Sequence, residues 1–213
     1  MIIRNKTLLG ALGLFVVVVG LLIAREISLN IQYRNNAQII NQSRLSEETA
    51  NVPLQPILRS TDPIIGQGAK QLFFFGDFTC SACKAQWQLL RAKQQAQPKS
   101  LTIIWKDTID LSNSESLAAA VAARCSGKDF GRAADELFKQ NDQLSAARYQ
   151  QIAKDLGLNQ ASFVDCQKNP SPTSLIQEDV QEAIALGLSQ SPTVYFNNRW
   201  YVGGLTEIEL SNL

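Results

Sequence analysis

Residues 73–87 read FFFGDFTCSACKAQW, and this stretch decides the fold. Its first part belongs to an apolar run, residues 70–75, of the kind that forms a buried β-strand. Its second part opens a helical stretch at residues 81–97. Cys80 and Cys83 stand where the strand gives way to the helix, so the sequence predicts that both thiols lie at a helix N-terminus.

A helix N-terminus suits a reactive pair of cysteines. The first turn has free backbone N–H groups and the positive end of the helix dipole, and both stabilise a thiolate. The thiolate is the form of cysteine that attacks a disulfide or leaves from one. The two-residue spacing lets the sulfurs bond, with Cys80 at the exposed end and Cys83 one turn further in. We therefore predict that both are catalytic, Cys80 as the attacking and leaving sulfur and Cys83 as the resolving one.

A C-x-x-C motif also occurs in zinc sites and in inert disulfides, and these remain alternatives for this pair. A zinc site would need a second close pair of ligands, but Cys125 and Cys166 lie far apart in the sequence. The chain contains no histidine, which excludes His-ligated metals and Ser-His-Asp or Cys-His catalysis. We therefore expect no metal. A purely structural disulfide would close a tiny loop and stabilise little.

Composition fits one folded domain with attachments. The chain has 213 residues, of which 45% are hydrophobic, enough to bury a core. Its 20 basic and 19 acidic residues leave a net charge of +1. That balance gives no reason to expect nucleic acid as a partner.

Residues 7–24 (TLLGALGLFVVVVGLLIA) carry no charge and follow two basic residues. A helix of this length spans about 27 Å, close to the hydrocarbon thickness of a bilayer. A cleaved signal peptide is the alternative, but cleavage after Ala24 would put Leu22 where a small residue is preferred. We predict that residues 1–24 form a short cytoplasmic tail and one transmembrane anchor. The rest of the chain would then lie on the extracytoplasmic side of the cell membrane.

The polar residues 25–61 separate this anchor from a folded domain at residues 62–213. We expect a flexible linker there, because Pro53 and Pro56 would end any helix that continues from the anchor. A short dimerising stalk is the alternative. Within the domain the predicted order is β-α-β, a helical block at about 115–188, then β-β-α. The corresponding stretches are residues 70–75, 81–97, 101–105, 193–196, 200–202 and 207–210.

The domain resembles the DsbA-like branch of the thioredoxin-fold oxidoreductases, which includes membrane-tethered members. The likeness covers roughly residues 62–211 and is carried by residues 62–66, 76–78, 123–125, 191–193 and 202–204, with Lys84, Trp87, Phe163, Cys166 and Asn197. It implies a thioredoxin-like α/β fold with the helical block inserted into it. It also implies an exported enzyme that forms, reduces or isomerises disulfides in other proteins.

The resemblance further assigns Ser191 and Pro192 to substrate binding. In thioredoxin folds a cis-proline faces the cysteine pair, and the residue before it offers backbone groups to an extended substrate. We therefore expect a cis Ser191–Pro192 bond beside Cys80. A proline that merely begins an edge strand is the alternative.

The remaining cysteines, Cys125 and Cys166, allow two interpretations: buried unpaired residues, or a structural disulfide that clamps the helical block. An oxidising compartment favours pairing, and some DsbA-like proteins carry a second bridge in this block. We therefore predict the disulfide, which would stabilise the fold by about 4 kcal/mol.

Some residues depart from the family pattern. Ser81 and Ala82 stand where relatives commonly have proline and the strongest oxidants have histidine, and Phe74 replaces a buried acid. The direction of electron flow is therefore open, and we favour a dithiol oxidase over a reductase or isomerase. We expect no cofactor. The expected partners are exported cysteine-containing proteins and a quinone-linked membrane protein of the DsbB or vitamin-K-epoxide-reductase type. A redox-inert, chaperone-like module that uses the groove beside Pro192 is the alternative.

Overall fold

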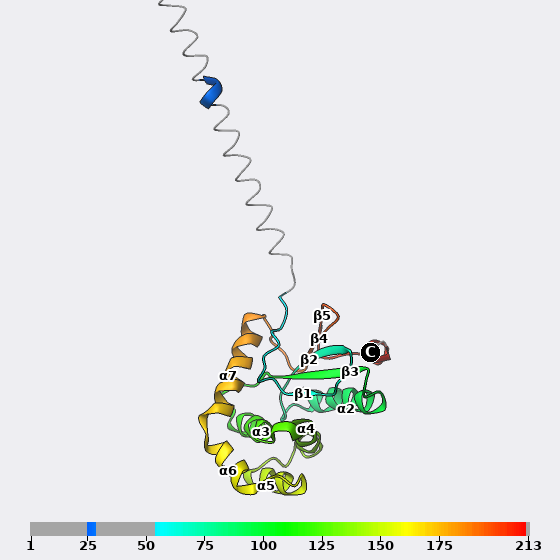
Figure 1. The fold of residues 1–213 in the computed structure, drawn as a ribbon, viewed down its shortest axis with the longest axis vertical. Coiled ribbons are helices and arrows are strands. Elements are labelled where there is room, and N and C mark those ends of the chain that lie inside the picture. Colours follow the sequence, from blue (N-terminus) through cyan, green and yellow to red (C-terminus); the bar gives the residue numbers. More distant parts are fainter. Residues whose placement is uncertain (1–24, 29–53, 212–213) are drawn as a thin grey trace, which may run out of the picture. The chain divides into compact units, whose positions relative to one another are not determined.

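A computed structural model describes residues 25–28, which are helical, and residues 54–211, which form the folded unit (Figure 1). The predicted membrane anchor at residues 7–24 lies outside these ranges. None of the helices within the two ranges is long and apolar enough to cross a membrane. The folded unit contains a five-stranded mixed sheet with the strand order β1-β3-β2-β4-β5.

The centre of the sheet is a parallel pair. Strand β2 (Lys70–Gly76) runs into helix α2 (Ser81–Ala96), which crosses over to strand β3 (Leu101–Asp107). All seven residues of β3 are buried, as expected for a strand that is covered on both faces. This crossover places the N-terminus of α2 directly after the C-terminal end of a central strand.

The sheet is completed by antiparallel strands on both sides. Strand β4 (Thr193–Phe196) pairs with β2 and then with β5 (Arg199–Val202), and helix α8 (Glu207–Ser211) follows. Asn197 and Asn198 turn the chain between β4 and β5 with φ values of 50° and 60°, the left-handed conformation that two-residue hairpins prefer. Strand β1 (Ile64–Ile65) lies antiparallel to β3 at the other edge.

Five α-helices and one 3₁₀ turn occupy the region between β3 and β4, where the sequence predicted a helical block. They are α3 (Ser114–Arg124), η1 (Gly127–Asp129), α4 (Phe130–Lys139), α5 (Ala146–Asp155), α6 (Gln160–Lys168) and α7 (Pro170–Ala185). Alternate strand residues divide the core between the two faces of the sheet. Phe74 packs with α2 and α4 through Trp87 and Phe138, whereas Phe73 belongs to a separate cluster with Ala183 of α7.

A buried ionic cluster joins the start of the folded unit to α7 and β3. Its members are the cations Arg59, Lys106 and Arg124 and the carboxylates Asp62, Asp107, Asp179 and Glu182. Lys106 is fully buried, and its Nζ lies 2.8 Å from Asp62 and 3.1 Å from Glu182. This arrangement requires residues 54–62 to lie against α7.

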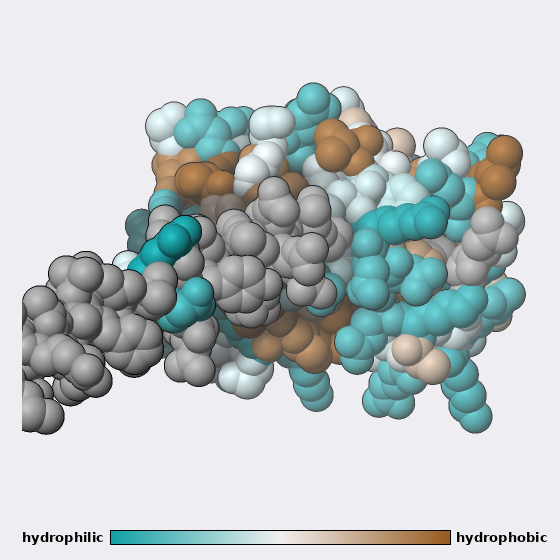
Figure 2. Space-filling view, turned by 90° about the horizontal axis from the view of Figure 1, so that it is seen from above, coloured by the Kyte–Doolittle hydropathy of each residue, from teal (hydrophilic) through white to brown (hydrophobic). Residues whose placement is uncertain are grey.

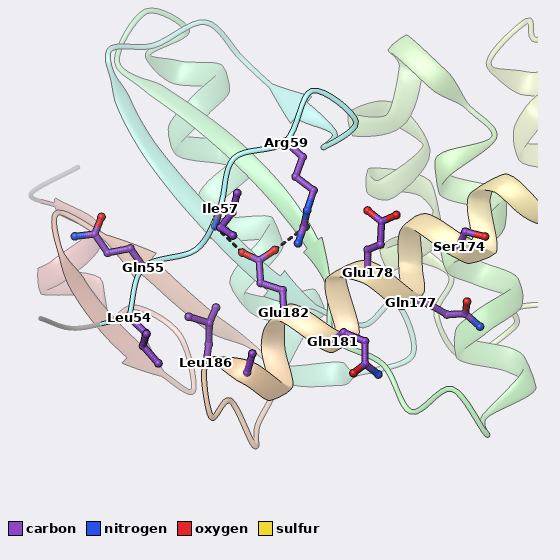
Figure 3. A pocket seen from close by; sticks show the side chains of 11 residues that line it. Leu54, Gln55, Ile57, Arg59, Ser174, Gln177, Glu178, Gln181, Glu182 and Leu186 are labelled. Carbon is purple, nitrogen blue, oxygen red and sulfur yellow. Dashed lines mark hydrogen bonds and ion pairs between the residues drawn. The ribbon is translucent and has the colours of Figure 1, made fainter. Parts of the chain in front are cut away.

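The folded unit therefore begins before the predicted domain start at residue 62. Figure 3 shows the segment running past α7, with the backbone N–H of Ile57 and the guanidinium of Arg59 both directed at Glu182. A groove of about 710 Å³ lies between this segment and α7, with Leu54 and Leu186 among its lining residues. None of the predicted site residues lines this groove.

Candidate active site

Cys80 is the N-cap residue of α2. Its backbone is extended, with φ −84° and ψ 119°, and its sulfur accepts a hydrogen bond from the backbone N–H of Cys83 at 3.1 Å. A thiol here occupies the place that serine or aspartate takes at most helix starts. The sulfur of Cys80 therefore lies at the positive end of the α2 dipole and has one backbone N–H directed at it.

Cys83 is in the opposite situation. Its side chain is fully buried, whereas Cys80 is partly exposed, and both are free thiols. Burial, and next the hydrogen bond with Cys80, raise the pKa of Cys83 well above its ordinary value. Cys83 is therefore protonated and shielded while Cys80 meets solvent, an asymmetry that suits the roles predicted for the two sulfurs.

A small polar network lies just before the pair and was not predicted. The carboxylate of Asp77 accepts hydrogen bonds from the N–H and hydroxyl of Thr79 at 2.8 and 2.9 Å and from the hydroxyl of Ser116 at 2.9 Å. Ser116 lies in α3, so the network ties the loop before Cys80 to the helical block. Asp77 belongs to the motif that carries the family resemblance, but no sequence signal marks Ser116 as its partner.

Ser191 and Pro192 directly precede strand β4 and lie beside Cys80. The bond between them is cis, and the thiol of Cys80 lies 3.6 Å from the carbonyl oxygen of Ser191. The expectation of a cis bond beside Cys80 is therefore confirmed, while the substrate-binding role of these residues stays a prediction. Ser191 is fixed by its hydroxyl, which donates to the carbonyl of Thr108 at 3.1 Å, and Pro192 by its carbonyl, which accepts from the N–H of Gly203 at 2.9 Å.

Gln86 of helix α2 contacts the segment that follows β5. Its Oε1 accepts a hydrogen bond from the N–H of Leu205 at 2.9 Å. Gly204 is needed at this contact, because its φ is 97° and a Cβ atom there would lie 2.2 Å from Oε1 of Gln86. The helix that carries Cys80 is thus connected to the segment that holds Pro192, a link that the sequence did not indicate.

Comparison with known proteins assigns the family. A family model described as thioredoxin matches residues 59–213. The chain belongs to the thioredoxin family. No curated protein sequence matches it.

Solved structures give this thioredoxin-family chain its structural neighbours. The thiol-disulfide exchange protein alpha-DsbA2 from Wolbachia pipientis superposes with a TM-score of 0.65 at 18% identity, covering 83% of this chain and 95% of that one. A thioredoxin-like oxidoreductase from Silicibacter pomeroyi DSS-3 gives 0.61 at 18% identity, with 72% and 90% covered. The catalytic domain of Proteus mirabilis ScsC gives 0.59 at 18% identity, with 72% and 89% covered. At this identity the likeness establishes the fold.

The other two cysteines of this thioredoxin-family chain are bonded to each other. The Cys125–Cys166 disulfide links the C-terminal end of α3 to α6 across a sequence separation of 41 residues. The neighbouring Arg124 pairs with Asp107 at 2.7 Å and with Asp179. The disulfide is therefore adjacent to the buried ionic cluster and remote in sequence from the reactive pair.

Over residues 25–28 and 54–211, no group of three or more His, Cys, Asp or Glu side chains could hold a metal ion. What the site offers is a shielded thiol, an accessible thiol and a carbonyl beside it. These groups suit exchange between a dithiol and the disulfide of another polypeptide.

Proposed function

We propose that this protein is an extracytoplasmic protein disulfide oxidoreductase that works through a mixed disulfide at Cys80. One observation carries the proposal: an accessible sulfur at a helix N-terminus stands beside the fully buried thiol of Cys83 and 3.6 Å from the carbonyl of Ser191. The same geometry supports both directions of exchange. We favour the oxidising direction, with exported cysteine-containing proteins as substrates.

In that direction the enzyme begins with Cys80 and Cys83 bonded. A substrate thiolate attacks Sγ of Cys80, the Cys80–Cys83 bond breaks, and its electron pair passes to Cys83, which takes up a proton. A second substrate thiolate then attacks the substrate sulfur of the mixed disulfide and releases Cys80 as a thiolate. The substrate loses two electrons and gains a disulfide, and the enzyme gains the two electrons.

Ser191 and Pro192 would hold the substrate during these steps. The carbonyl of Ser191 points at Cys80 and can accept a backbone N–H from an extended substrate, as in other forms of strand addition. Proline has no N–H, so Pro192 places no competing donor near the sulfurs. The substrate cysteine would thus meet Cys80 in a fixed orientation.

The location and the partner are part of the same proposal. Residues 7–24 would anchor the chain, and the Cys125–Cys166 disulfide suits an oxidising compartment. Each cycle leaves Cys80 and Cys83 reduced, so an oxidant must restore their disulfide. A quinone-linked membrane protein of the DsbB or vitamin-K-epoxide-reductase type would accept these electrons.

Equilibration of the full chain with glutathione buffers tests the proposal. Alkylation and mass spectrometry should show one reversible disulfide between Cys80 and Cys83, which Cys80→Ser abolishes and the control Ser81→Ala retains. A potential near the value of about −120 mV for DsbA supports an oxidase, and one near the value of about −270 mV for thioredoxin supports a reductase. A chain that does not exchange in any buffer would instead be a redox-inert binding module.

A further inference from the structure

A small pocket lies next to Ser191, on the α7 side of the sheet, and neither Cys80 nor Cys83 lines it. Its volume is about 270 Å³, and it lies between the residues that follow β3, the C-terminal half of α7 and the segment that leads into Ser191. Ser191 and Thr108 both line the pocket, and the hydroxyl of Ser191 donates to the carbonyl of Thr108. The pocket therefore begins at the residue whose own carbonyl contacts Cys80.

The lining of the pocket is apolar on the side of α7. Val180 and Ala183 are buried there, and Ile184 adds an apolar side chain that is 62% exposed. Hydrophobic patches also interrupt the polar surface on the face shown in Figure 2. Because pockets for small-molecule ligands usually measure about 300–1,000 Å³, a volume of about 270 Å³ suits a single side chain better than a cofactor.

Asp110 is the charged residue among those that line the pocket, and the other polar lining residues are neutral. Asp110 is exposed, and hydrogen bonds from the hydroxyl and N–H of Ser112 lower the pKa of its carboxyl group. No lysine or arginine is among the lining residues. The pocket therefore favours an apolar side chain and disfavours an acidic one.

We propose that this pocket is a substrate subsite that takes an aliphatic or aromatic side chain from the polypeptide joined to Cys80. The inference rests on the proposed function, since the occupant belongs to a chain held by the mixed disulfide. An extended substrate that pairs with Ser191 advances about 3.3 Å per residue. A side chain one to three residues from the substrate cysteine can then reach the pocket.

Reduced single-cysteine peptides provide the test. Each peptide consists of Ser and Gly around one cysteine, with Leu, Phe, Ala or Asp two residues from that cysteine. Each peptide is mixed with the oxidised full chain and reduces it, and reduced glutathione serves as the reference thiol. Acid quenching, alkylation and mass spectrometry give the rate at which the Cys80–Cys83 disulfide disappears. We expect the Leu and Phe peptides to react about tenfold faster than the Ala peptide, and the Asp peptide to react slowest.

Two matched variants test whether the preference for the Leu peptide over the Ala peptide arises in this pocket. Ile184→Glu places a charge in the pocket at an exposed position and should reduce the Leu-to-Ala ratio to below about twofold. Ile64→Glu makes the same change at an isoleucine of β1 that is 55% exposed and does not line the pocket, and it should keep the full ratio. Neither variant should alter the rate with glutathione, which has no aliphatic or aromatic side chain to place in the pocket.

The outcomes separate the two proposals. If wild type reacts with glutathione but treats the Leu and Ala peptides alike, or if Ile184→Glu keeps the full preference, the subsite is wrong and the oxidoreductase stands. If neither glutathione nor any peptide reduces the pair, the proposed function fails and the subsite fails with it.

Discussion

At the scale of single residues, the two thiols of the active site differ in exposure. Cys80 is partly exposed, and Cys83 is fully buried with a raised pKa. We predict that limited iodoacetamide treatment of the reduced protein modifies Cys80 and leaves Cys83 intact, because alkylation requires an accessible thiolate. Mass mapping of the labelled peptides checks this result. Preferential labelling of Cys83 would reverse the roles of attacking and resolving sulfur.

Lys106 is a second residue whose surroundings determine how much it contributes to the free energy of unfolding. It is fully buried among Asp62, Asp179 and Glu182. We predict that Lys106→Met lowers the free energy of unfolding by about 3–5 kcal/mol, since it leaves buried carboxylates without their cation. Urea unfolding of the full chain, followed by tryptophan fluorescence, measures the change.

Lys139→Met is the matched control for that variant. Lys139 pairs with Glu136 at the surface, and its side chain is 70% exposed. Exposed pairs of this kind contribute about 0–1 kcal/mol, so the control should unfold almost as wild type does. Equal losses in the two variants would show that the buried cluster does not depend on Lys106.

At the scale of helices, the Cys125–Cys166 disulfide fastens α3 to α6. We predict that the double variant Cys125→Ala/Cys166→Ala unfolds with a free energy lower by about 4 kcal/mol, because the unfolded chain gains the freedom of the opened loop. Denaturation with and without dithiothreitol measures this difference. Dithiothreitol should destabilise wild type by about this amount relative to the double variant, in which it can reduce only a Cys80–Cys83 bond. Equal responses of the two proteins would show that the Cys125–Cys166 bond does not stabilise the fold.

Some of the helices and strands were predictable from the sequence, and others were not. The strand and helix around Cys80 were predictable, because apolar residues 70–75 and the polar-apolar mixture of residues 81–97 have distinct periodicities; the structure has Lys70–Gly76 and Ser81–Ala96. Strand β1 was not, because the two residues Ile64–Ile65 carry no period.

Long-range polar contacts were also beyond prediction. The predicted strand ended at residue 105, yet β3 continues through Lys106 and Asp107, whose partners on α7 come more than 70 residues later in the sequence. Ser116 and Gln86 support the active site in the same way. Local patterns place the cysteines, whereas the residues that hold their surroundings are brought together by the tertiary fold.

At the scale of the whole folded unit, the ionic cluster joins its first segment, its sheet and two helices with one more carboxylate than cations. Burial, and next the charge of Asp107, raise the pKa of Asp179 to about 7. The folded protein therefore keeps a proton that the unfolded chain releases above about pH 4. The contribution of Asp179 to the free energy of unfolding should fall as the pH rises from about 4 to 7.

Denaturation at several pH values tests this sign. The stability difference between wild type and Asp179→Asn should become less favourable to wild type as the pH rises from 5 to about 7.5. Asp165→Asn, which changes an exposed carboxylate on α6, should give a profile parallel to wild type. A parallel profile for Asp179→Asn as well would mean that the cluster holds no extra proton.

The chain as a whole combines this folded unit with residues 7–24, and their hydropathy leads to a separate prediction. We expect the full chain to fractionate with membranes and to resist carbonate extraction, because an uncharged helix of that length spans a bilayer. A chain that starts at Arg25 should be recovered in the soluble fraction and should still exchange with glutathione, since Cys80, Cys83 and Ser191 lie in the folded unit. A membrane-impermeant maleimide should label Cys80 in intact cells if the anchor leaves the domain outside the cytoplasm. Recovery of a soluble mature protein that begins near Arg25 would identify the segment as a cleaved signal, and labelling only after lysis would reverse the orientation.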